Sequence, residues 1–190
     1  MTFHFCGYFP KKATPLPEGY NLPGVVDIAS VSDCIAEGPE DWVTSGTFNE
    51  LGFFDDVDSA EAVVPQPDSS QFEIDAYEFL DERFEGGLAQ PWTVPQLACE
   101  PPGSDFEPLG FDVVSKSVTD FFECSPLSCN GAAQTFRANA HCLFDALDDA
   151  VAAAKVFSTG NWEPGPYYVA RVLRRRRTDE LGSTEHAAEL

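Results

Sequence analysis

The chain has little positive charge. Its 190 residues include 11 Lys and Arg against 32 Asp and Glu, which gives a formal net charge of −21 and a sequence pI near 4.1. The phosphates of nucleic acids and of anionic lipids repel such a surface. We therefore exclude nonspecific binding to nucleic acid and to an anionic membrane surface.

The sequence also lacks a long apolar run. No segment approaches the roughly 20 apolar residues that a helix needs to cross a bilayer. Near the N-terminus the apolar residues come before Lys11 and Lys12 and are interrupted by Pro10, whereas a signal peptide begins with its basic residues. The expected location is the cytoplasm.

Motifs that would fix a reaction are absent too. The sequence has no Gly-rich phosphate loop, HExxH or GxSxG motif and no EF-hand loop. The closest cysteine pair, Cys124 and Cys129, has four residues between its members, whereas zinc ligands usually come as Cys-x2-Cys. We expect no metal and no cofactor, and a structural zinc site is the alternative.

The apolar content is sufficient for a folded core. Hydrophobic residues make up 43% of the chain and aromatic residues 13%, which exceeds what intrinsically disordered chains contain. The length suits one domain or two small ones. We therefore expect a globular protein.

Short strands are expected in both halves of the chain. The clearest lies at 71–80, where small and large apolar residues alternate with polar ones. This alternation predicts one buried face, with Glu73, Asp75 and Tyr77 on the other. Four further strands are expected, at 3–9, 25–30, 109–115 and 166–173.

Two helices are expected, each after an aspartate. One spans 56–64 and is stopped by Pro65, and the other follows Asp145 and is closed by Gly160. Because Asp55 and Asp145 stand where an N-cap belongs, we interpret them as helix caps rather than as catalytic carboxylates.

These elements recur in the same order. The block at 54–62 matches the block at 144–152, and an aromatic strand follows each one. A strand with Asp27 and Ser30 precedes the first block, and a strand with Asp112 and Ser115 precedes the second. The collinear order predicts two similar strand-loop-helix-strand modules from an internal duplication. The alternative is that capped strand-to-helix units resemble one another because the same cap chemistry recurs.

The expected fold class is therefore α+β, with both modules packed into one compact unit. The predicted division is a first α/β module at 1–85, a Pro- and Gly-rich connector at 86–108 and a second module at 109–173. A charged tail with its own arginine run, expected to be flexible, follows at 174–190.

Thiols and histidines offer one catalytic hypothesis. Catalysis by a cysteine needs a thiol that a neighbouring base can deprotonate. The candidates are Cys124 and Cys129, in a turn-rich loop, with His141 as the base. The alternative is that all six cysteines are reduced and structural, as is usual in a cytoplasmic chain of this size.

Acidic residues concentrate between Asp55 and Glu85. Because carboxylates with aromatic residues among them suit a basic protein, this segment is the expected docking surface. The alternative is a solvated acidic face, or adaptation to salt. The expected partner-binding residues are Asp55, Asp56, Asp58, Glu73, Asp75, Tyr77, Glu78, Asp81 and Glu82.

The functional hypothesis is an acidic cytoplasmic protein that neutralises a basic protein partner. Its most concrete form is a bacterial immunity protein that inhibits a toxin, because nuclease toxins are basic. The alternatives are an inhibitor that mimics DNA, and a thiol-dependent enzyme that uses the region from Cys124 to Cys142.

Overall fold

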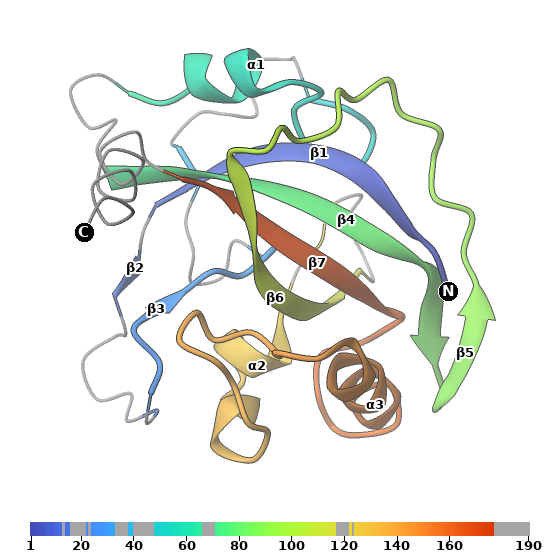
Figure 1. Ribbon diagram of the computed structural model, residues 1–190. Helices are drawn as coiled ribbons and strands as arrows, with labels where there is room; N and C mark the ends of the chain where they lie inside the picture. Colours follow the sequence, from blue (N-terminus) through green and yellow to red (C-terminus); the bar gives the residue numbers. More distant parts are fainter. Residues whose placement is uncertain are drawn as a thin grey trace, which may run out of the picture.

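A computed structural model shows an α+β fold built on one antiparallel sheet (Figure 1). It describes residues 1–12, 14–15, 22, 24–32, 38–39, 48–65, 71–116, 122 and 124–176. The sheet has five strands in the order β1-β4-β7-β6, with β5 beside the end of β4. These strands are β1 (Phe3–Lys12), β4 (Phe72–Glu85), β5 (Leu88–Pro91), β6 (Phe106–Ser115) and β7 (Tyr167–Arg175).

The helices lie towards the two ends of the strand order. In Figure 1, α1 (Val57–Ala62) lies above β1, and α2 (Pro126–Cys129) and α3 (Leu147–Phe157) lie below β6 and β7. A short 3-10 turn, η3 (Ala132–Gln134), follows α2. No helix in the described parts of the chain is long and apolar enough to cross a membrane.

Strand β4 is buried on both faces, so the prediction of one exposed face was wrong. It pairs with β1 on one side and with β7 on the other. Both Ala76 and Tyr77, which point to opposite faces, have no exposed surface. A central strand that is covered on both faces loses its exposed side, whatever its sequence alternation.

Two corrections concern the first half of the chain. The expected strand at 25–30 is reduced to β3 (Asp27–Ile28), which pairs with β2 (Thr14–Pro15) outside the main sheet. The segment therefore does not correspond to β6, where Asp112 and Ser115 lie. In the sheet, β1 occupies the edge opposite β6.

The helix caps also differ from the prediction. Asp56, rather than Asp55, caps α1, and its carboxylate accepts a hydrogen bond from the Ser59 amide at 2.8 Å. Ala146 occupies the cap position of α3 and provides no side-chain bond. Asp145 is exposed one residue earlier. The sequence pattern therefore located both helices and missed each cap by one residue.

The predicted connector and the predicted tail both contain residues of the sheet. The segment at 86–108 contains β5 and the first residues of β6. Strand β7 continues through Arg175, so the arginine run begins inside the sheet. The rest of the expected tail, after Arg176, lies outside the described residues, as does Cys34.

Two asparagine turns flank the sheet. The Asn49 amide group donates to the Cys6 carbonyl at 2.9 Å, and its Oδ1 accepts from the amides of Leu51 and Phe53 at 3.0 and 3.3 Å. Each turn then leads into a residue whose backbone forms hydrogen bonds with an edge strand of the sheet. In the first turn, Phe54 and Tyr8 exchange two backbone hydrogen bonds of 2.8 Å.

The second turn makes the same bonds at the other edge. Asn139 donates to the Leu109 carbonyl at 2.7 Å and accepts from the amides of His141 and Leu143 at 2.9 and 3.1 Å. Phe144 and Phe111 then exchange two backbone hydrogen bonds of 2.9 Å. The two turns thus fix the start of each helix against an edge strand.

Candidate functional site

Two of the expected docking residues are in the core. Asp75 and Tyr77 have no exposed surface. The Asp75 carboxylate accepts two hydrogen bonds from the Arg174 guanidinium, at 2.8 and 3.1 Å. Such a buried bidentate pair satisfies both charges internally. Neither side chain is therefore available to a partner in this fold.

Other carboxylates on β4 have internal partners as well. Glu78 is ion-paired with Arg171 on the neighbouring strand β7. Asp81 accepts a hydrogen bond from the Thr2 amide at 2.8 Å, and this bond is the main cause that lowers the pKa of Asp81. Glu73 and Glu82 are half-buried. The acids of β4 therefore do not form one continuous docking face.

The acids near α1 form a groove instead. A hollow of about 520 Å³ lies between the start of α1 and the segment that leads into β6. We call it the acidic groove, and its acidic lining residues are Asp56, Asp58, Glu100 and Asp105. Of the expected docking residues, only Asp56 and Asp58 line it. Asp55 lies beside it and accepts hydrogen bonds from Asn49 and Cys99.

Tyr8 and Phe106 form the aromatic part of the groove, with ring centroids 5.4 Å apart. The Tyr8 hydroxyl donates to the Glu100 carbonyl at 2.8 Å. Burial, and then the charges of Asp105 and Glu100, raise the pKa of Tyr8 to about 12. The groove thus combines apolar rings with a strongly negative surrounding.

One cation lines the groove among the described residues. Arg175 donates to Asp105 at 2.9 Å and to Glu61 at 2.5 Å. Its charge is therefore already shared between two carboxylates. Asp58 and Glu100 both line the groove and are exposed, and they come from different segments, Asp58 from α1 and Glu100 from the connector.

Sequence reasoning missed the connector side of this groove. Glu100 and Asp105 lie in a segment interpreted as a plain Pro- and Gly-rich linker. Their proximity to α1 depends on long-range pairing, such as the hydrogen bond from the Glu100 amide to the Asp55 carbonyl at 3.0 Å. The only available signal was that acidic residues recur within the connector.

The predicted thiol pair is adjacent in the structure. The Cys124 thiol shares a hydrogen bond with Cys129. The Cys129 Sγ also lies 3.5 Å from the Ser32 hydroxyl and 3.7 Å from the Ser128 hydroxyl. Cys129 is partly exposed, whereas Cys124 is buried. The hydrogen bond from Cys124 is the main cause that lowers the pKa of Cys129 to about 5.

His141 has a different partner. Its Nδ1 lies 2.7 Å from the Asp27 carboxylate, which also accepts from Arg174 at 3.3 Å. The described hydrogen bond of the His141 ring is therefore with a carboxylate rather than with a thiol. The expected Cys-His arrangement gains no support from this geometry.

A buried carboxylate organises the region around the thiol pair. Asp112 accepts hydrogen bonds from the hydroxyls of Ser30 and Ser125 at 3.0 and 2.6 Å and from the Val31 amide at 2.9 Å. Burial nevertheless raises its pKa to about 6. Asp112 thereby ties the segment that carries Ser32 to the loop before α2.

A second thiol region lies near Asn49. The Cys99 thiol donates to the Asp55 carboxylate at 3.1 Å and to the Cys6 carbonyl at 3.5 Å. Burial, reinforced by Asp55, raises the pKa of Cys99 to about 12, and burial raises that of Cys6 to about 12 as well. These thiols stay protonated at neutral pH.

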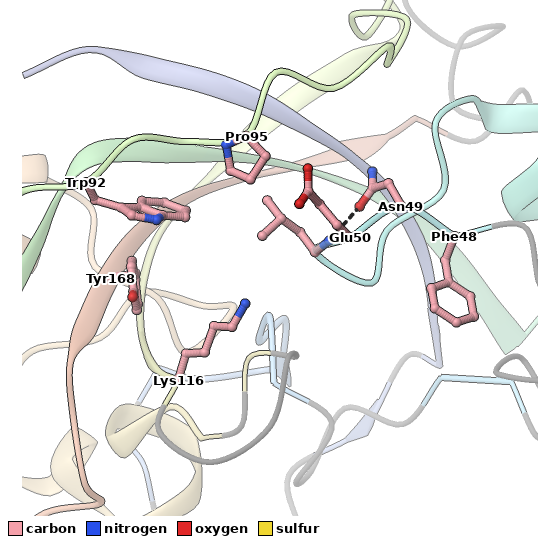
Figure 2. A pocket seen from close by; sticks show the side chains of 8 residues that line it. Phe48, Asn49, Glu50, Trp92, Pro95, Lys116 and Tyr168 are labelled. Atoms are coloured by element: carbon pink, nitrogen blue, oxygen red, sulfur yellow. Dashed lines mark hydrogen bonds between the residues drawn. The ribbon is translucent and has the colours of Figure 1, made fainter.

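A further hollow, of about 480 Å³, opens beside the aromatic core (Figure 2). Trp92 and Tyr168 form one wall, with ring centroids 4.6 Å apart and an interplanar angle of 70°. Lys116 reaches into the space opposite Glu50, and its ammonium lies 5.6 Å from the centroid of the Phe122 ring. The volume falls in the range of small-molecule sites.

Metal ligands do not gather in the parts of the chain that the structure describes, where no group of three His, Cys, Asp or Glu could hold an ion. Comparison with known proteins yields no match to a protein family, to a curated protein or to a solved structure.

Proposed function

We propose that the chain binds a basic protein partner through the acidic groove. The observation that supports this proposal is the convergence of Asp56, Asp58, Glu100 and Asp105 around one hollow. Arg175 is the cation among its described lining residues, and it already has two carboxylate partners. The groove therefore carries excess negative charge that a partner's Lys or Arg can neutralise.

The shape of the groove suits a long basic side chain. The half-buried ring of Phe106 can contact its apolar stem or its cation, while the exposed carboxylates of Asp58 and Glu100 pair with the charge. A negative surface of this kind also speeds the approach of a basic protein, and salt weakens that effect.

The concrete form of this proposal is an inhibitor of a basic toxin, as in bacterial toxin–immunity pairs, acting in the cytoplasm. The net charge of −21 supports it. An inhibitor that mimics DNA is a second form, and it would need carboxylates spaced along a surface. A single groove supports the protein-binding form better.

We also infer that the two halves derive from an internal duplication. The asparagine turns make the same hydrogen bonds, and Gly7 and Gly110 have φ angles of +128° and +147° beside them. In the sheet, Gly7 pairs with Tyr77 and Gly110 pairs with Val172. Tyr77 and Val172 also pair with each other, as equivalent residues on either side of a two-fold axis would.

Zero-length crosslinking with a carbodiimide tests the binding proposal, because it joins a carboxylate only to an amine in direct contact. The protein is treated in an extract of the cells that produce it, and the crosslinked carboxylates are located by mass spectrometry. We expect links from Asp58 and Glu100 to lysines of one basic protein.

Two variants of equal charge make the test specific. The double substitution Asp58→Asn with Glu100→Gln should remove the crosslinked species. The control, Asp145→Asn with Glu85→Gln, alters exposed acids that do not line the groove and should retain it. Equal loss in both variants, or links spread over all exposed acids, would contradict the proposal.

A further inference from the structure

We propose that Cys129 and Cys124 form a thiol–disulfide exchange site, in which Cys129 attacks a small-molecule disulfide and Cys124 resolves the product. The proposal rests on the arrangement of the two thiols and on their different exposure. It is independent of the acidic groove, which lies beside α1.

The surroundings of Cys129 favour a thiolate. Its Sγ lies near the hydroxyls of Ser32 and Ser128, at 3.5 and 3.7 Å, and it shares a hydrogen bond with the Cys124 thiol. Hydroxyl and thiol donors stabilise a sulfur anion without adding charge. These contacts agree with the lowered pKa of Cys129.

Other titratable groups face the pair from three further elements. Cys142, in the turn before α3, interacts with Cys129 and with Asp112 of β6. Tyr167, on β7, interacts with Cys124. Burial raises the pKa of Cys142 to about 12 and also raises that of Tyr167. Both groups are therefore neutral when Cys129 ionises, whereas Asp112, with its pKa raised to about 6, carries a negative charge at neutral pH.

Exposure assigns the two roles. Cys129 is partly exposed and can meet a solute, whereas Cys124 is only 6% exposed. The Ser115 amide donates to the Cys124 carbonyl at 2.8 Å and fixes this residue to the end of β6. The buried thiol can therefore react with Cys129 but is shielded from a large reagent.

The oxidant in this exchange is a low-molecular-weight disulfide such as oxidised glutathione. The Cys129 thiolate attacks one sulfur, forms a mixed disulfide and releases one glutathione thiolate. Cys124 then loses its proton and attacks the Cys129 sulfur, which forms the Cys124–Cys129 disulfide and releases the second thiolate. Both protons end on glutathione, so two protein thiols are oxidised and one disulfide is reduced.

Alkylation of the intact protein by iodoacetamide tests the first step, with peptide mapping to follow each cysteine. At pH 6 we expect Cys129 to react at least about tenfold faster than Cys99. Cys124→Ala should slow Cys129 at this pH, whereas Cys99→Ser should leave it unchanged. A Cys129 rate no greater than that of Cys99 would overturn the proposal.

Oxidised glutathione tests the second step. In the wild-type protein we expect the Cys124–Cys129 disulfide, and in Cys124→Ala a glutathione adduct that persists on Cys129. Cys129→Ser should leave Cys124 reduced. The proposal fails if the wild-type protein accumulates the adduct as Cys124→Ala does, or if Cys124 is oxidised in Cys129→Ser.

Discussion

The two edges of the sheet are held in the same way but are surrounded by different chemistry. At one edge the Asn49 turn leads into α1, and at the other the Asn139 turn leads into α3. The first turn has carboxylates around it, because Asp55 accepts from Asn49 itself. The second lies near the hydroxyls and thiols of the α2 region. The shared bonds hold each turn against its edge strand, and the differences give the two sides different chemical environments.

The thiols show the effect of this difference most clearly. Cys99, in the first region, donates to a carboxylate, and burial together with that charge keeps it protonated. Cys129, in the second, contacts neutral donors that stabilise its anion. Both are partly exposed. Burial, reinforced by a neighbouring carboxylate, raises the pKa of Cys99, whereas neutral hydrogen-bond donors lower the pKa of Cys129 despite its partial burial.

The largest predicted effect concerns the glycines that approach the two turns. A Cβ added at Gly7 would lie 2.5 Å from the Phe54 carbonyl oxygen, and one at Gly110 would lie 2.7 Å from that of Phe144. Because both positions also have positive φ, we expect Gly7→Ala and Gly110→Ala each to lower the free energy of unfolding by about 2–4 kcal/mol.

Urea denaturation measures these losses. Gly86→Ala is the control, because Gly86 has a φ of +58° and an added Cβ would meet no atom within 4 Å. Gly86→Ala should lower the free energy of unfolding only by the strain of a left-handed backbone, about 1–2 kcal/mol. Losses at Gly7 and Gly110 no larger than at Gly86 would show that the edge contacts are unimportant.

A smaller effect is predicted for the helix caps, where the two halves differ. Asp56→Ala should destabilise the protein by about 1 kcal/mol, because it removes the bond to the Ser59 amide. Ala146→Asp should stabilise it by up to about 1 kcal/mol, because the backbone there is already extended and lacks a side-chain cap. Thermal unfolding should therefore shift in opposite directions, and shifts of the same sign would refute this reading of the caps.

Local sequence signals predicted the α+β class and most of the elements. The apolar alternation at 166–173 marked β7, and the spacing after Asp145 marked α3, because these patterns reflect one strand or one helix alone. The double burial of β4 was not predictable in this way. It depends on which distant segments pack over the faces of the sheet, such as α1 and α3, and that is a property of the whole chain.

The candidate sites show the same limit. The proximity of Cys124 and Cys129 followed from their short separation in sequence. The pairing of Asp75 with Arg174 joins residues 99 positions apart, and it turned an expected docking residue into a core residue. Charge counting along a segment cannot distinguish an acid that faces solvent from one that neutralises a distant arginine.

The central claim is that the two asparagine turns hold the two edges of the sheet in the same way. Its most direct test is the free energy of unfolding of Asn49→Ala and Asn139→Ala, measured side by side in urea. Each substitution removes one bond to an edge-strand carbonyl and two bonds from backbone amides, and Asn49→Ala also removes the bond to the half-buried Asp55. We predict losses of about 2–3 kcal/mol for each variant, equal to within about 1 kcal/mol. A large loss in one variant and none in the other would contradict the account.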